Sequence, residues 1–232
     1  MKRKLYDQLV IWKTKRHGKS AMMIEGARRV GKSYIVEEFA KNEYKSHIII
    51  DFFKVGDDIK DLFKNYRDNL DMLFIYLSTF YSTKLYPRES IIVFDEIEFC
   101  PAARAAIKYL VEDGRYDYLE IGSLLGMQMS TRKKLKSDEK QEDYLVPSEE
   151  EKMVLQPMDF EEFLWALGEE NLMEFVRMKF EIKEPVGQSM HRKLMDYFRL
   201  YMIVGGMPQA VMEYLETRSF EDVDRVKRQI LN

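Results

Sequence analysis

Short apolar runs alternate with amphipathic stretches through the first two thirds of the chain. The runs are rich in β-branched and aromatic residues, and several show no polar alternation, which is typical of strands covered on both faces of a sheet. We expect strands at 20–25, 47–53, 90–96, 116–122 and, as a short closing strand, 152–156. The spacing of apolar residues between them predicts helices at 3–14, 32–41, 57–66, 69–83 and 102–112. This alternation predicts an α/β fold, a parallel sheet flanked by helices.

The last third of the chain has a different pattern. After Pro157 the spacing is helical throughout, over 159–167, 169–181, 190–203, 207–216 and 219–231. We therefore predict a core domain at 1–156 and a small all-helical domain at 157–232. The pattern weakens over 124–151, where we expect a mobile surface loop. The last helical stretch stops without a C-cap, so we expect the sequence to be truncated at its C-terminus.

One motif carries a specific chemistry. The segment 26–33 fits the P-loop pattern G-x-x-x-x-G-K-[S/T], with an apolar strand before it and a helix after it. Its glycines let the backbone wrap around a phosphate chain, and the helix N-terminus presents partial positive charge to that chain. The nucleotide-binding residues are predicted to be Gly26, Ala27, Arg28, Arg29, Val30, Gly31, Lys32, Ser33 and Tyr34.

Two members of the motif have individual roles. Lys32 should reach the β- and γ-phosphates, and the Ser33 hydroxyl should be a ligand of Mg²⁺. Arg28 and Arg29 could add phosphate contacts or could simply point into solvent.

A pair of acids ends the strand at 90–96. Asp95 and Glu96 are a weak signal alone, because many buried strands end in acids. With a P-loop upstream, the pair falls at the sheet edge where ligands bind in such folds. Asp95 is then predicted to hold Mg²⁺, and Glu96 to accept a proton from the attacking water. The presence of both acids favours hydrolysis over binding alone.

Ser123 follows Gly122 at the end of the fourth predicted strand. Its hydroxyl could orient the water or touch the γ-phosphate. A Gly-Ser pair after a strand is also an ordinary turn, so both interpretations stay open.

Five sequence blocks together resemble a known family. The blocks are 26–33, 94–101, 121–125, 157–164 and 204–208. They look like the prokaryotic AAA-type P-loop ATPases related to the archaeal ATPase group, which often carry a C-terminal DUF4143 domain. The resemblance implies an AAA-like core with a helical lid, ATP and Mg²⁺ as ligands, and Ser123 as a sensor of the γ-phosphate.

The resemblance also bears on the helical part. Gly206-Met207-Pro208 resembles the Gly-x-Pro element of signal-transducing ATPases, which implies that Pro208 lies beside the adenine. The alternative is a simple helix-breaking turn. Members of the family usually continue well beyond the point where this chain ends. No arginine maps securely onto an arginine finger, although Arg104, Arg115 and Arg132 are conceivable.

Composition excludes several classes of protein. With 46% apolar and 33% charged residues and a net charge of −3, the chain has an ordinary globular composition, which argues against wholesale coating of nucleic acid. Cys100 is the single cysteine, so an intramolecular disulfide is impossible and we expect a small packed side chain there. The N-terminus lacks an apolar leader and the longest apolar runs are strand-sized, which predicts a cytoplasmic protein with no membrane association.

These observations favour an ATP-hydrolysing, Mg²⁺-dependent molecular switch that binds ATP and ADP between the sheet edge and the lid. The alternative is a nucleotide-dependent protein- or DNA-binding module with negligible hydrolysis, whose partner contacts a region after Asn232. A small-substrate kinase is a third possibility, disfavoured by the Asp95-Glu96 pair. An oligomer is possible, but the sequence does not indicate one.

Overall fold

The computed structural model describes residues 1–123 and 149–231. The chain divides into two compact units, Leu5–Leu155 (the core unit) and Met1–Lys4 with Gln156–Asn232 (the helical unit). We predicted that the chain divides near residue 156 into two domains. The two compact units are defined by their internal contacts, which do not show that either unit folds by itself, so the domain boundary stays a prediction. Most of the loop predicted at 124–151, including Arg132, lies outside the described residues.

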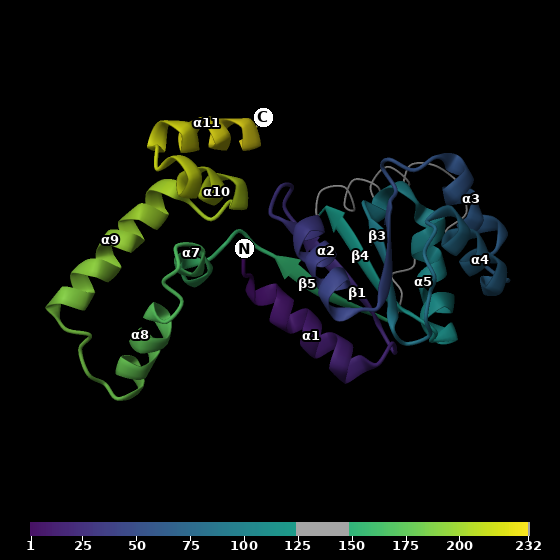
Figure 1. Ribbon diagram of the computed structural model, residues 1–232, viewed down its shortest axis with the longest axis horizontal. Coiled ribbons are helices and arrows are strands. Elements are labelled where there is room, and N and C mark those ends of the chain that lie inside the picture. Colours follow the sequence, from purple (N-terminus) through teal and green to yellow (C-terminus); the bar gives the residue numbers. More distant parts are fainter. Residues whose placement is uncertain (124–148, 232) are drawn as a thin grey trace, which may run out of the picture. The chain divides into compact units, whose positions relative to one another are not determined.

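The core unit is built on a five-stranded sheet (Figure 1). Its strands are β1 (Ala21–Gly26), β2 (Ser46–Asp51), β3 (Ser90–Asp95), β4 (Asp117–Ser123) and β5 (Glu150–Leu155). They lie in the order β2-β3-β4-β1-β5, and every neighbouring pair is parallel. The predicted fold class is thereby confirmed. Because the strands are parallel, the ends of β1, β3 and β4 meet at one edge of the sheet, which is where the predicted site residues lie.

Helices cover both faces of the sheet (Figure 1). They are α1 (Lys4–Arg16), α2 (Lys32–Glu43), α3 (Asp57–Asn65), α4 (Leu70–Phe80), the 3₁₀ turn η1 (Ile97–Phe99) and α5 (Pro101–Asp113). Residues of α1 and α2, such as Leu9 and Phe39, form one apolar layer with one face of the sheet.

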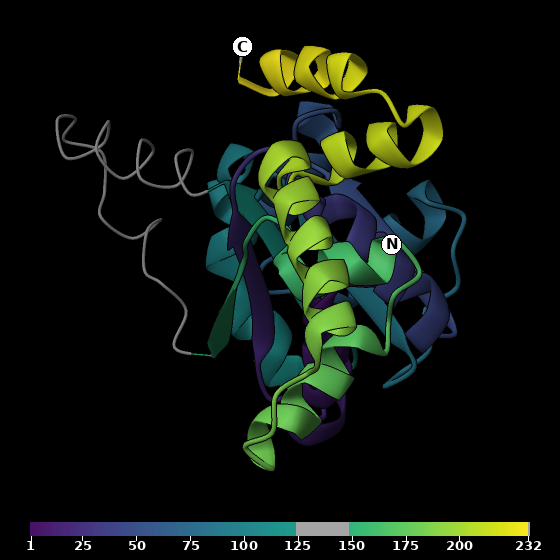
Figure 2. The same cartoon turned by 90° about the vertical axis from the view of Figure 1, so that its left-hand side faces the viewer.

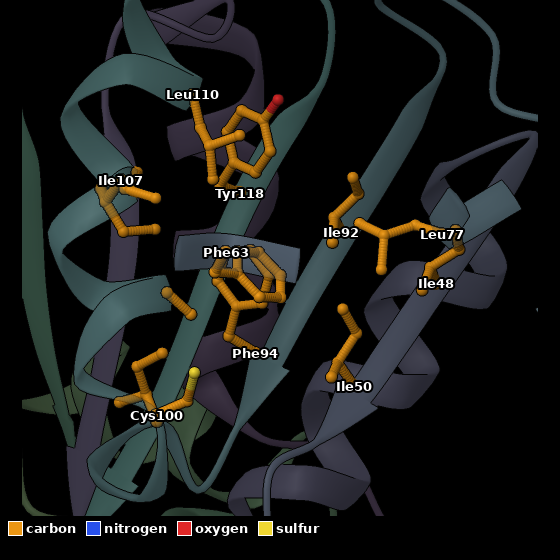
Figure 3. Packing of buried hydrophobic residues seen from close by; sticks show 14 of the residues in the cluster. Ile48, Ile50, Phe63, Leu77, Ile92, Phe94, Cys100, Ile107, Leu110 and Tyr118 are labelled. Atoms are coloured by element: carbon orange, nitrogen blue, oxygen red, sulfur yellow. The ribbon is translucent and has the colours of Figure 1, made fainter. Parts of the chain in front are cut away.

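The other apolar layer lies under α3, α4 and α5. There the rings of Phe63 and Phe94 lie 5.5 Å apart, edge to face (Figure 3). Cys100 is buried in this layer, which confirms the prediction of a packed side chain.

Strand β2 departs from the prediction. It ends at Asp51 rather than at residue 53, and its side chains alternate between buried and half-buried. Ile48 and Ile50 are buried, whereas His47 and Ile49 are only half-buried. The expectation that this strand is covered on both faces was wrong because β2 lies at the edge of the sheet, where its cover is incomplete.

The helical unit contains α7 (Phe160–Ala166), α8 (Leu172–Glu181), α9 (Gln188–Val204), α10 (Pro208–Thr217) and α11 (Phe220–Leu231). Asp159 and Glu162 form a capping box that starts α7, since each side chain accepts a hydrogen bond from the other's backbone N–H. Helices α10 and α11 lie at the C-terminal end of α9 (Figure 2). The core of this unit contains Met158, Phe163, Val204, Ala210, Val211 and Val223.

Candidate nucleotide site

The segment between β1 and α2 has the backbone of an anion-binding loop. Strand β1 ends at Gly26, and α2 begins at Lys32 after Gly31, which caps the helix in the left-handed region with φ 95°. Residues other than glycine adopt this conformation at a cost. The first turn of α2 directs its N–H groups, which have no partner within the helix, towards the loop. The predicted strand, loop and helix are therefore all present.

Gly26 is needed for a second reason. A Cβ atom there would lie 2.5 Å from the backbone oxygen of Leu155, which no rotamer change could relieve. The two residues face each other in the β1–β5 register. Gly26 thus lets the end of β5 approach the start of the loop.

Lys32 lies over this loop. Its Nζ donates hydrogen bonds to the carbonyl oxygens of Gly26 and Ala27, both at 2.9 Å. Partial burial lowers the pKa of Lys32, and the charges of Glu96 and Asp95 oppose that effect. The ammonium group is therefore held close to the two acids at the end of β3.

The carboxylate of Asp95 and the hydroxyl of Ser33 lie together beside the loop. The Ser33 hydroxyl donates a hydrogen bond to the Asp95 carboxylate, and the backbone N–H of Glu96 donates to Asp95 Oδ1 at 3.0 Å. Burial raises the pKa of Asp95, while these two hydrogen bonds oppose the rise. A hydroxyl and a carboxylate are ligands that Mg²⁺ prefers, so these residues fit a magnesium ion bound to a nucleotide.

Glu96 occupies a strained position directly after β3. Its φ is 52°, in the left-handed region that a glutamate adopts rarely. This turn starts η1 and leaves the carboxyl group half-buried near Asp95 and Glu98. Burial raises the pKa of Glu96, and the neighbouring charges of Glu98 and Asp95 raise it further.

Ser123 completes the set at the end of β4, where it faces Gly26 in the β1–β4 register. Its backbone N–H and its Oγ donate hydrogen bonds to Glu98 Oε1, at 3.3 and 2.9 Å. The structure therefore brings the predicted residues of β1, β3 and β4 to one sheet edge. Their catalytic and binding roles remain predictions.

Two acids at this edge were not singled out from the sequence. Asp51 ends β2 opposite Asp95 in the register, and its charge helps to raise the pKa of Asp95. The argument used for Asp95 did not reach it, because the predicted strand continued to residue 53, whereas β2 ends at Asp51. Glu98 offered no such signal, since only the left-handed turn at Glu96 directs it towards β4.

The other predicted residues lie farther from this centre or have other partners. Arg28, Arg29 and Tyr34 are exposed, and Tyr34 is 53% exposed in the first turn of α2. Pro208 starts α10 in the helical unit, and its place beside adenine stays a prediction.

Two of the conceivable finger arginines form ion pairs within the core unit. Arg104 pairs with Glu120 and Glu150, and Arg115 pairs with Asp113 and Asp71. The third, Arg132, is not among the described residues. Neither pairing assigns a finger.

Among the described residues, none of the helices combines the length and the apolar character needed to span a membrane.

Comparisons with known proteins bear on the fold and on the family. A solved structure, the Walker-type ATPase of Pyrococcus abyssi, is similar with a TM-score of 0.51 at 15% identity, over 99% of this chain and 72% of the other. Similarity at this level of identity concerns the fold alone, and it supports the predicted AAA-like architecture. No curated protein gives a significant match. The family model described as an AAA domain matches residues 18–164, which include the phosphate loop and the acids after β3. This match covers more than half of the sequence, and the chain therefore belongs to the AAA domain family.

Proposed function

We propose that this chain is a Mg²⁺-dependent ATPase that acts as a molecular switch. The observation that carries the proposal is the meeting of four residues at one sheet edge, beside the glycine-capped N-terminus of α2: Lys32 from α2, Asp95 and Glu96 from the end of β3, and Ser123 from the end of β4. The AAA domain implies nucleotide binding. The choice of ATP, the magnesium ion and the hydrolysis step are the parts that we propose.

Binding follows from the loop. The N–H groups at the start of α2 are directed at the phosphates, and the Lys32 ammonium exchanges its two carbonyl partners for β- and γ-phosphate oxygens. Ser33 and Asp95 would hold Mg²⁺, which when bound neutralises charge on the phosphates. Tyr34, Arg28 and Arg29 are proposed to line the mouth of the site.

Hydrolysis needs a proton acceptor near the terminal phosphate. Glu96 accepts a proton from a water molecule whose oxygen forms a bond to the γ-phosphorus, while the bond from that phosphorus to the oxygen of the ADP leaving group breaks. Ser123 donates its hydroxyl proton in a hydrogen bond to the γ-phosphate and so holds it in line. The narrower assignment to the DUF4143-associated group is part of the proposal and is supported by the five sequence blocks.

Two substitutions test the assignment of roles. Lys32→Ala should weaken ATP binding at least about 100-fold, because it removes the ammonium that reaches the phosphates. Glu96→Gln should preserve ATP binding and lower turnover by about 100-fold or more, because an amide cannot accept the proton. Calorimetry measures the binding, and phosphate release measures the turnover.

Matched controls come from the same elements. Lys41→Ala changes an exposed lysine on α2 that is paired with Glu37, and Glu89→Gln changes an exposed acid just before β3. Both proteins should behave as the wild type. Equal turnover in the Glu96→Gln protein would contradict the role of Glu96. ATP binding without phosphate release, with or without DNA, would favour the alternative of a nucleotide-dependent binding module.

A further inference from the structure

The turn after β3 brings a third acid to the site. The left-handed conformation of Glu96 starts η1, and this short turn directs Glu98 towards the end of β4. Glu98 Oε1 accepts two hydrogen bonds from one residue, from Ser123 N–H at 3.3 Å and from Ser123 Oγ at 2.9 Å. A single carboxylate oxygen thus joins the turn after β3 to the predicted phosphate sensor.

The other oxygen of Glu98 has a different environment. Oε2 is buried and lacks a hydrogen-bond partner among the residues that the structure describes. Glu98 also lies close enough to Glu96 and Lys32 for its charge to act on both of them. The carboxylate is therefore part of the site, where Ser123 donates two hydrogen bonds to Oε1 and the side chain of Glu96 also interacts with it.

A serine hydroxyl has one proton to donate. While Ser123 Oγ donates to Glu98 Oε1, it has no second proton with which to bind a phosphate oxygen. We propose that Glu98 is the positioning residue for Ser123, holding its hydroxyl when no γ-phosphate is present and yielding it when one binds. This inference rests on the proposed function, because it assumes that Ser123 meets the γ-phosphate.

The two hydrogen bonds from Ser123 to Glu98 respond differently when the γ-phosphate binds. The backbone N–H of Ser123 continues to donate to Glu98 and keeps the carboxylate in place. Only the hydroxyl changes its acceptor, and it does so for ATP but not for ADP, which lacks the γ-phosphate. Glu98 therefore weakens the preference of the site for ATP over ADP, and its removal should strengthen that preference.

Nucleotide affinities test the exchange without relying on turnover. Calorimetry with Mg²⁺ present gives the dissociation constants of ADP and of a non-hydrolysable ATP analogue for each variant. Glu98→Ala should raise the preference for the analogue roughly tenfold, because the Ser123 hydroxyl no longer has to give up a hydrogen bond to a carboxylate in order to bind the γ-phosphate. Glu98→Gln, which keeps an acceptor oxygen, should give a smaller rise and serves if the alanine protein does not fold.

A double variant tests whether Glu98 acts through the Ser123 hydroxyl or only through the negative charge of its carboxylate. In a Ser123→Ala protein, adding Glu98→Ala should leave the preference for the analogue unchanged, since no hydroxyl remains to be exchanged. A rise as large as in the wild-type background would mean that Glu98 only repels phosphate, and it would overturn the proposal. Glu89→Ala, at the opposite end of β3, controls for loss of an exposed acid.

The same measurements distinguish a failure of the role of Glu98 from a failure of the proposed ATPase function. If the wild type binds ADP and the analogue in a Lys32-dependent way but Glu98→Ala and Glu98→Gln leave the preference unchanged, only the role of Glu98 falls. If the wild type binds neither nucleotide, the proposed function falls and the role of Glu98 falls with it.

Discussion

Glu120 is an ionisable residue buried inside the sheet. It lies on β4, has no exposed surface, and is held by Arg104 Nη1 at 2.6 Å from Oε2. The same guanidinium reaches Glu150 at 2.9 Å, and Lys152 lies 3.5 Å from the other oxygen of Glu150. Burial raises the pKa of Glu120 to about 8, Arg104 opposes the rise and Glu150 adds to it. Glu120 therefore retains a proton near neutral pH.

This proton makes the stability of the core unit depend on pH. The folded-state pKa of Glu120 lies above the unfolded value, so its contribution is complete below the unfolded pKa and is lost as the pH rises towards about 8. Glu120→Gln keeps the shape and an acceptor oxygen for Arg104 but removes the titration. Its free energy of unfolding should therefore fall less than that of the wild type between about pH 5 and about pH 8.

Urea unfolding at several pH values measures this difference. Glu89→Gln, which changes an exposed acid, should keep the pH dependence of the wild type. If the Glu120→Gln protein loses stability with pH as steeply as the wild type does, Glu120 is not the group that holds the proton.

In the turn between α9 and α10, Gly206 packs closely against the backbone of Met158. Gly206 accepts a hydrogen bond from the Met158 N–H at 2.7 Å, and a Cβ atom on Gly206 would lie 2.1 Å from the Met158 oxygen. Tyr201 donates its hydroxyl proton to that same oxygen at 2.8 Å. The glycine of the Gly-x-Pro element is thus required by backbone packing within the helical unit, whatever Pro208 does.

Gly206→Ala should therefore destabilise the helical unit by about 2–4 kcal/mol, because one of two backbone segments must move. Gly168→Ala is the matched control, since Gly168 has a φ of 82° and no neighbour within 4 Å of an added Cβ. The control should cost only about 1–2 kcal/mol, the strain of the left-handed conformation alone. Equal losses in the two proteins, measured by urea unfolding, would argue against the close approach at Met158.

The first residues of the chain belong to the helical unit, although α1 continues into the core unit. Arg3 is 5% exposed, pairs with Glu162 through Nε at 3.1 Å and donates from Nη2 to the Gln156 oxygen at 2.6 Å. Farther along α1, Leu9 and Trp12 are buried in the core unit. The chain therefore passes between the units twice, at Lys4–Leu5 and at Leu155–Gln156. Within the helical unit, the hydrogen bond from Arg3 to Gln156 joins the two segments that adjoin these points.

Arg3→Ala should destabilise the helical unit by about 3 kcal/mol, because it leaves the buried Glu162 carboxylate without its cation. The two tryptophans report the units separately, since Trp12 lies in the core unit and Trp165 in α7. In proteins that keep one tryptophan each, the Trp165 unfolding midpoint should fall while that of Trp12 stays.

Arg16→Ala is the control for this change, because Arg16 lies on the same helix and forms a half-exposed pair with Glu151. It should shift neither midpoint by more than the small effect of a surface ion pair. A fall in the Trp12 midpoint equal to that of Trp165 would mean that the two units unfold together and that Arg3 is not specific to the helical unit.

The features that depend on near neighbours in the chain could be predicted from the sequence. The strands, the helices and the loop at 26–33 follow from periodicity, glycine placement and turn chemistry, all of which act over a few residues. The parallel sheet followed as well, because strands alternating with helices leave few other topologies.

The features that depend on strand order and on packing between distant segments could be seen only in the folded chain. The order β2-β3-β4-β1-β5 places β2 at the edge, and β3 beside β4, which brings Glu98 to Ser123 across 25 residues of sequence. Arg3 likewise reaches Gln156, across 153 residues of sequence, and Glu162. Such pairs leave no periodic signal, because their energy comes from burial and hydrogen bonding between segments that meet only after folding.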